Sequence, residues 1–207
     1  MAEKCYVTYR LEESDGSYVF LYPADWKARA VVENGRREVF ITGPRNRAGT
    51  YSTSLAVAAT RSAAASPAEA AAELLARYRA AFNSQGTGPS ATTVAGLPAV
   101  EVEVAYAMPL PLDSIHPQWT VIRQRSIFFK QGDQLYELDY AASEEDYQTW
   151  LPAFRALTRS FTFEAEIARP ALRQPIAVPA FPQVREDAPE YRADGSPSDE
   201  QPEQHVS

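Results

Sequence analysis

The sequence has few of the side chains that enzymes and metal proteins most often use for chemistry. Its 207 residues include one cysteine, Cys5, and only two histidines, His116 and His205. A single cysteine excludes an internal disulfide and a cysteine-rich zinc site. The two histidines are far apart in the chain and do not suggest a metal cluster or an acid–base pair. We therefore predict no catalytic residue, no cofactor and no metal ligand.

Two short stretches resemble catalytic motifs, and we interpret both as structural. Asp113, Ser114 and His116 are close in sequence, but a catalytic triad is defined by spatial roles and seldom forms from adjacent loop residues. In the stretch 86–89, Gly-Thr-Gly-Pro, proline removes an amide donor and no lysine follows. This stretch therefore predicts a connector and not a phosphate-binding loop. A hydrolase is the least favoured of the functional alternatives.

Basic charge and long apolar runs are also scarce. There are 20 lysines and arginines against 27 acidic residues, a net charge of −7. This balance argues against nucleic-acid binding and against a polybasic membrane anchor. No window reaches the roughly 18 apolar residues of a membrane span, and residues 1–10 do not form a signal peptide. We expect a cytoplasmic protein, or an exported or membrane-peripheral one if the true start lies upstream.

The composition changes after Phe163. Residues 164–207 are rich in proline, glutamate and glutamine, include nine acidic and four basic residues, and show no sustained periodicity. Such a segment buries too little apolar surface to offset its conformational entropy. We predict one folded domain over residues 1–163 and an acidic, proline-rich, largely disordered tail over 164–207.

The stretch from Trp119 to Phe163 predicts a β-hairpin followed by a helix. Strand-forming residues fill Trp119–Lys130 and Gln134–Ala142, and the glycine between them suits a turn. Alternation places Tyr136, Leu138 and Tyr140 on one buried face. Ser143 is the expected N-cap of the helix. The helix presents an apolar stripe at three- and four-residue spacing: Tyr147, Trp150, Leu151, Phe154 and Leu157.

Further strands and one more helix precede this stretch. Cys5–Leu11 and Ser17–Tyr22 predict a first hairpin. Ser66, Pro67 and Glu69 form a capping box that opens a helix. The buried stripe of this helix comprises Leu74, Leu75, Tyr78 and Phe82, and its end is expected near Asn83. Strands are also expected at Glu38–Thr42, Leu55–Ala59, Ala91–Val94 and Pro98–Tyr106.

Charged residues alternate along three of the expected strands. They are Glu101, Glu103, Arg123, Arg125, Glu137 and Asp139. A three-residue turn at Gln131–Asp133 would place Arg125 opposite Asp139, whereas a two-residue turn would place it opposite an aromatic residue. Charge pairing favours the three-residue turn. The set then predicts a salt-bridge ladder on one sheet face, with a site for a small polar ligand as the alternative.

The stretch Ala107–Gln118 contains three prolines and is predicted to be a loop and not a strand. Its apolar residues suggest either a binding element on a rigid scaffold or a loop that folds back over the core. For the first case we predict partner binding by four residues: Leu110, Leu112, Ile115 and His116.

Several of these stretches together resemble the PsbP-like family. They are Tyr18–Trp26, Ser66-Pro67, Val94–Pro98, Gly132–Tyr136 and Ser160-Phe161. The resemblance spans about Tyr6 to Phe163 and includes the DcrB-like bacterial proteins and the Mog-type Ran-binding proteins. It implies an α+β fold, an α/β/α sandwich in which helices flank a central antiparallel sheet on both faces.

The same resemblance implies a function without catalysis. In plants and cyanobacteria such proteins are extrinsic subunits or assembly factors of photosystem II, linked to calcium and chloride retention. For this chain it implies an interaction or assembly module with an unidentified protein partner, associated peripherally with a membrane or photosynthetic complex. A small-ligand or calcium-binding protein of the same fold is the alternative. No metal ligand of the family can be matched to a position in this sequence.

Overall fold

A computed structural model describes residues 5–12, 17–33, 35–62, 65–79, 81 and 83–164. The expected turn at residues 13–16, the side chain of Phe82 and the tail from residue 165 onward lie outside these residues. The division at residue 163 and the disorder of the tail therefore stay predictions.

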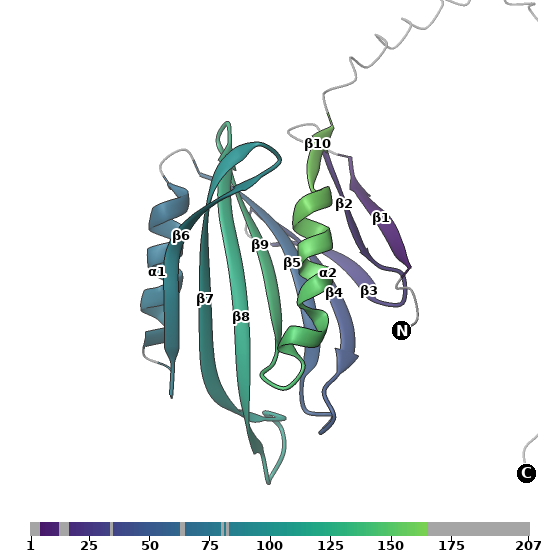
Figure 1. The fold of residues 1–207 in the computed structure, drawn as a ribbon, viewed down its shortest axis with the longest axis vertical. Coiled ribbons are helices and arrows are strands. Elements are labelled where there is room, and N and C mark those ends of the chain that lie inside the picture. The colour runs from purple at the N-terminus through teal and green to yellow at the C-terminus, as the bar shows by residue number, and fades with distance from the viewer. Residues whose placement is uncertain are drawn as a thin grey trace, which may run out of the picture. The chain divides into compact units, whose positions relative to one another are not determined.

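The described residues form two antiparallel sheets (Figure 1). The larger sheet has seven strands in the order β3 (Lys27–Glu33), β4 (Arg36–Arg45), β5 (Ser52–Arg61), β9 (Gln134–Ser143), β8 (Gln118–Gln131), β7 (Leu97–Leu110) and β6 (Gln85–Val94). The smaller sheet has the order β1 (Tyr6–Leu11), β2 (Ser17–Pro23) and β10 (Thr162–Glu164). The two predicted hairpins, β1–β2 and β8–β9, are thus confirmed.

The β8–β9 hairpin has a two-residue turn, and the three-residue turn predicted for it is wrong. Gln131 pairs with Gln134, and Gly132, with a φ of +60°, and Asp133 form the turn between them. Tyr136, Leu138 and Tyr140 are buried on one face of β9, as their alternation predicts.

Helix α2 (Tyr147–Ser160) covers this face of the sheet. Its residues Leu151, Phe154 and Leu157 are buried in the same core as Leu138 and Tyr140. Ser143 is not the N-cap, because it is still part of β9 and pairs with Ile122. Asp146 is the N-cap, and the helix begins at the next residue. The Asp146 carboxylate accepts a hydrogen bond from the Ser143 hydroxyl at 3.0 Å. Charge pairing thus predicted the wrong turn at the start of β9, and the capping pattern predicted the wrong N-cap at its end.

Helix α1 (Pro67–Arg79) lies against the opposite face of the sheet. Its capping box is confirmed: the Ser66 backbone N–H donates to Glu69 Oε2 at 2.9 Å, and the Glu69 N–H donates to Ser66 Oγ at 3.2 Å. Leu74 packs with Ala71, Val102 and Phe128 in a second, smaller core. The helix ends at Arg79, about one turn before the predicted position.

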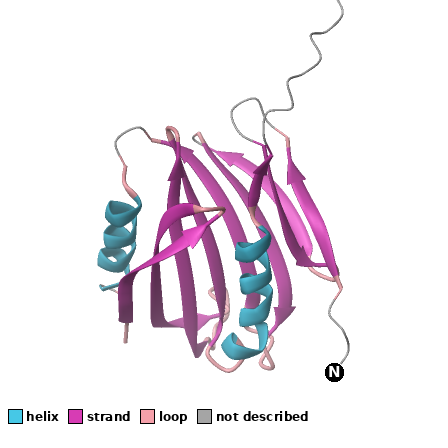
Figure 2. Ribbon diagram, turned by 45° about the horizontal axis from the view of Figure 1, so that its top comes forward, coloured by secondary structure: helices cyan, strands magenta, loops and turns pink. Residues whose placement is uncertain are grey.

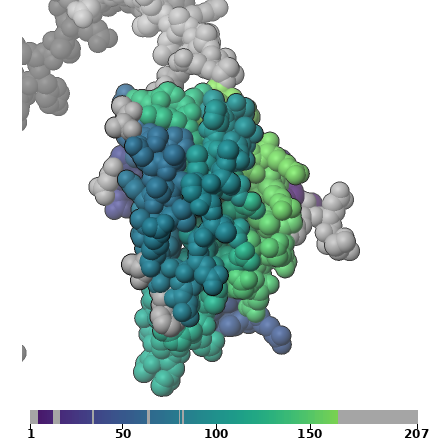
Figure 3. Space-filling model, turned by 60° about the vertical axis from the view of Figure 1, so that its left-hand side comes forward, coloured from purple at the N-terminus to yellow at the C-terminus, as the bar shows by residue number. Residues whose placement is uncertain are grey.

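The α+β class is confirmed, but an α/β/α sandwich describes the structure poorly. Seven strands at about 4.8 Å spacing are too wide for one short helix to cover. Helix α1 packs chiefly over β6, β7 and β8. On the other face, α2 shares the covering with the small sheet, whose Tyr18 packs on Phe161 and Tyr136. Figures 2 and 3 show α1 and α2 on either side of β6 and β7.

The predicted loop 107–118 is strand at its two ends and a connection in between. β7 runs to Leu110 and β8 begins at Gln118, which leaves only residues 111–117 as the connection. Pro109 is tolerated because β6 pairs with β7 only as far as Ala105, so that beyond this point one side of β7 needs no N–H. The predicted connector at residues 86–89 likewise lies within β6, an edge strand with an irregular register between Thr87 and Ser90.

Candidate functional site

The four predicted partner-binding residues differ in exposure. Leu110 is 7% exposed and is part of the buried interior, whereas Leu112 and Ile115 are 76% and 91% exposed. His116 is exposed, and its backbone N–H donates to Ser114 Oγ at 3.2 Å. This contact belongs to a turn and not to a catalytic triad. The structure does not test partner binding by these residues, but Leu110 offers little surface for it.

The structure adds two apolar residues that the sequence reasoning missed. Trp119 and Val121, at the start of β8, are 61% and 43% exposed. We call Leu112, Ile115, Trp119 and Val121 the hairpin tip, because they lie at the β7–β8 turn and on the strand that leaves it. Alternation alone could not have indicated this exposure, since Trp119 and Val121 share a face of β8 with Ile127 and Phe129, which are buried.

The predicted six-residue salt-bridge ladder is wrong, because the two-residue turn splits it between the two faces of the sheet. Arg125 lies opposite Tyr140, and Asp139 lies opposite Ser126. The first set faces α2 and comprises Glu101, Glu103, Arg123 and Arg125. Glu137 and Asp139 point to the other face, where Glu137 meets Arg36 of β4.

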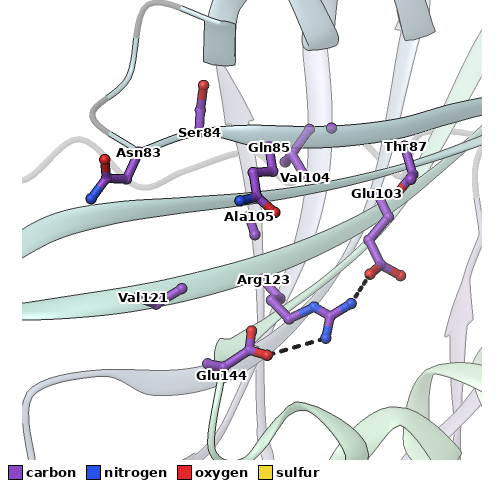
Figure 4. A pocket seen from close by; sticks show the side chains of 11 residues that line it. Asn83, Ser84, Gln85, Thr87, Glu103, Val104, Ala105, Val121, Arg123 and Glu144 are labelled. Carbon is purple, nitrogen blue, oxygen red and sulfur yellow. Dashed lines mark hydrogen bonds and ion pairs between the residues drawn. The ribbon is translucent and has the colours of Figure 1, made fainter.

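On the α2 side of the sheet, Arg123 is the centre of a cluster of polar side chains. Its guanidinium contacts Glu103 and lies 3.2 Å from Glu144, as the dashed lines in Figure 4 show. The Tyr147 hydroxyl donates to Glu103 at 2.8 Å, and the Arg123 guanidinium lies 4.5 Å from the Tyr147 ring centre. Arg123, Glu103 and Glu144 border a cavity of about 770 Å³, which Val121 of the hairpin tip also lines.

The protonation states in this cluster do not suit acid–base catalysis near neutral pH. Burial, together with Glu103, raises the pKa of Tyr147 well above its ordinary value, so the phenol stays neutral. Burial alone would lower the pKa of Arg123, but Glu103 and Glu144 outweigh it and raise this pKa. The cluster therefore combines a permanent cation, a neutral phenol and two carboxylates that are already paired.

Polar side chains on the α1 side form a chain of hydrogen bonds. Asp139 accepts hydrogen bonds from the Ser126 hydroxyl and, at 3.2 Å, from the Gln124 amide. Gln124 in turn accepts one from the Tyr78 hydroxyl at 2.8 Å. Burial and the neighbouring Glu137 carboxylate raise the pKa of Asp139 to about 8. This is a titratable group near neutrality, and these contacts hold it in a hydrogen-bonded network within the sheet.

Two more general observations concern metal ions and membranes. Among the residues that the structure describes, no three His, Cys, Asp or Glu side chains come together as they would to hold a metal ion. None of the described helices is long and apolar enough to cross a bilayer.

Comparisons with known proteins give one family match and several similar solved structures. A search of the curated proteins finds no match. Similar solved structures include the cyanobacterial PsbP protein (CyanoP) of Synechocystis, with 16% identity, a TM-score of 0.47 and coverage of 76% of this chain and 92% of that one. They also include LpqN, involved in cell envelope biogenesis of Mycobacterium tuberculosis, with 14% identity, a TM-score of 0.44 and coverage of 77% and 92%. A Pseudomonas aeruginosa protein of unknown function, PA94, has 14% identity, a TM-score of 0.46 and coverage of 72% and 91%. The PsbP family model matches residues 7–163, and the chain therefore belongs to the PsbP family.

Proposed function

We propose that this chain is a non-catalytic interaction module that binds a protein partner through the hairpin tip. The observation that carries the proposal is the exposure of four apolar side chains, among them Ile115 at 91% and Trp119 at 61%. Grouped exposed apolar residues, in contrast to single ones, mark interaction surfaces. Family membership supports the non-catalytic part of the proposal, because PsbP-like proteins generally act without catalysis.

The tip has the anatomy of a small binding surface. Tryptophan is enriched among the residues that dominate binding energy, and its large ring buries much apolar area when a partner covers it. Trp119 pairs with Pro109 in the β7–β8 ladder, so its backbone is held in place before any partner binds. A position fixed in advance lowers the ordering cost of association. The partner we expect presents an apolar surface, at the periphery of a membrane complex.

The test compares proteins captured from an extract of the native host by three versions of the full chain. The first is the unchanged protein, and the second carries Leu112→Ser, Ile115→Ser and Trp119→Ser. The third is a matched control with Val7→Ser and Val32→Ser, two residues that are 38% and 69% exposed on other strands. Leu110 is left intact because it is buried.

We expect the unchanged protein and the control to capture the same partner and the tip variant to lose it. Binding of the purified partner should then weaken by at least about tenfold, since truncating a central aromatic anchor typically costs about 2 kcal/mol or more. Equal capture by the tip variant, with the same affinity for the purified partner, would contradict the proposal.

A second candidate function is the binding of a small ligand on the α2 side of the sheet. The cavity of about 770 Å³ favours it, because its size suits a small molecule. For the calcium version of this candidate, the test is a calorimetric titration with calcium, in which the absence of heat counts against it. The charged side chains of this cavity are largely paired with one another, since Arg123 contacts both Glu103 and Glu144.

A further inference from the structure

A second cavity, of about 260 Å³, lies between the C-terminal half of α2 and strands β6, β7 and β8. Its polar lining comes from two sources. Arg125 and Glu101 lie on the sheet, and Arg155, Thr158 and Arg159 project from α2. Thr92 of β6 adds a hydroxyl group. The cavity is therefore lined by three guanidinium groups, one from strand β8 and two from helix α2.

The charges around this cavity do not balance. Three arginines face one carboxylate, Glu101, which leaves a formal charge of +2. In the larger cavity the opposite holds, since Arg123 is shared by two carboxylates. Arg155 and Arg159 are exposed, and neither forms an ion pair with any residue that the structure describes. They are four residues apart and so lie on the same side of the helix.

Arg125 is fixed in orientation before any ligand arrives. Its Nε and Nη2 both contact the same Glu101 oxygen, and the two side chains are only 27% and 17% exposed. An arginine has five N–H donors in a planar fork, so the remaining donors of Arg125 can serve a ligand. Arg125 is thus held in place on the sheet, and Arg155 and Arg159 are exposed on α2. All three line the same cavity, which suits them to bind an anion.

We propose that Arg125, Arg155 and Arg159 bind a phosphate monoester group. At neutral pH this group carries a charge of about −1.5 to −2, which matches the excess positive charge of the cavity. Its oxygens accept bidentate hydrogen bonds from arginine, and the hydroxyl of Thr92 supplies a neutral donor. The favourable effect of a cation near a helix C-terminus explains Arg159, in the last turn of α2, but not its convergence with Arg125 and Arg155.

Two ligands share this chemistry, a soluble phosphate monoester and the headgroup of phosphatidic acid. The test titrates the full chain in a calorimeter with phenyl phosphate. In parallel it measures sedimentation with phosphatidylcholine vesicles prepared with and without phosphatidic acid. Saturable binding to phenyl phosphate alone would identify a soluble ligand, and binding to the phosphatidic acid vesicles would identify the lipid headgroup. Both results support the proposal, provided that binding depends on the arginines.

That dependence is measured with three double variants. Arg155→Gln with Arg159→Gln should weaken binding by at least about tenfold, because it removes charge-assisted hydrogen bonds to the phosphate oxygens. Arg29→Gln with Arg77→Gln removes the same charge from exposed positions on β3 and α1 and should leave affinity within about twofold. Arg155→Lys with Arg159→Lys keeps the charge but loses the fork, and we expect intermediate affinity.

Three results would overturn the proposal: no binding of either probe by the unchanged chain, unaltered binding by the Arg155→Gln and Arg159→Gln variant, or an equal loss in the control. Thermal unfolding of each variant shows whether it folds, and both arginines of α2 are exposed, so their replacement should not change the core. Loss of phosphate binding with intact partner capture would separate this site from the hairpin tip.

Discussion

Replacement of Asp139 by asparagine should make the protein more stable at mildly alkaline pH and weaken the pH dependence of its stability. The carboxylate lies on the α1 side of β9, beside Glu137, and accepts hydrogen bonds from Ser126 and Gln124. Burial first, and Glu137 second, raise its pKa from 3.8 to about 8, against the opposing effects of Ser126, Gln124 and Arg36. Asparagine has nearly the same shape and an oxygen that can accept the same hydrogen bonds.

The sign of the effect follows from proton uptake. Between about pH 4 and pH 8 the folded protein holds a proton on Asp139 that the unfolded chain has released. The contribution of this group to the free energy of unfolding is therefore greatest below about pH 4, falls as the pH rises, and is constant above about pH 8. The difference between 3.8 and about 8 corresponds to at most about 6 kcal/mol. Asp139 is only partly buried and is coupled to Glu137, so we expect about 1–3 kcal/mol.

Urea denaturation followed by tryptophan fluorescence, at intervals from about pH 5 to pH 9, measures this contribution. The matched control is Asp133→Asn in the β8–β9 turn, where the carboxylate pairs with Arg61 and is 48% exposed. We expect the control to keep the slope of the unchanged protein. If the Asp139→Asn variant keeps it too, or if the unchanged protein becomes more stable from about pH 5 to pH 8, the assignment of a raised pKa to Asp139 is refuted.

Two further stability predictions concern single contacts. Gly43→Ala should lower the free energy of unfolding by about 1–3 kcal/mol, because an added Cβ would lie 2.6 Å from the Trp26 ring. Urea denaturation measures this loss, which should be smaller when Trp26→Phe is also present. Equal costs in both backgrounds would contradict this. Ser66→Ala should lower the free energy of unfolding by about 1 kcal/mol, because the α1 capping box is lost. The control Ser90→Ala alters an exposed strand position and should lower it by less than about 0.5 kcal/mol. No difference between these two variants would argue against the cap.

The parts of the fold that the sequence predicts correctly depend on local interactions. The capping box of α1 uses atoms within four residues of one another, and the burial of Tyr136, Leu138 and Tyr140 follows from strict alternation in one strand. Neither requires knowledge of the rest of the chain. For the same reason the family resemblance, which rests on such stretches, is confirmed over residues 7–163.

The errors concern features that depend on a neighbouring element. Prolines in residues 107–118 suggested a loop, but Pro109 is allowed in β7 because β6 stops pairing at Ala105. Ser143 looked like a helix cap, but its pairing with Ile122 keeps it in β9. Charge pairing favoured Arg125 opposite Asp139, although the hydrophobic alternation of the same strands already required a different register. Burial of aromatic residues outweighs exposed ion pairs, each of which contributes at most about 1 kcal/mol.

The candidate sites could be predicted only in part for a similar reason. The apolar composition of their loop indicates Leu112 and Ile115, whereas the strand pattern that includes Trp119 does not indicate its exposure. No pattern in the sequence brings Arg155 and Arg159 together with Arg125. The helical period places the two α2 arginines on one side, but which strand that side faces depends on how α2 crosses the sheet.

The two sites lie along one side of the sheet and differ in chemistry in a way that makes them separable. Val121 of the hairpin tip also lines the larger cavity, whose charged residues Arg123, Glu103 and Glu144 carry a net negative charge. The smaller cavity, with Arg125, Arg155 and Arg159, carries a net positive one. A partner at the tip would therefore meet apolar and acidic groups first, and a phosphate group would bind farther along at the basic ones. The hairpin tip and the three arginines share no residue. The effects of the tip variant and of the arginine variant on the binding free energy of either ligand should therefore be additive. Marked non-additivity would indicate a single ligand that spans both sites.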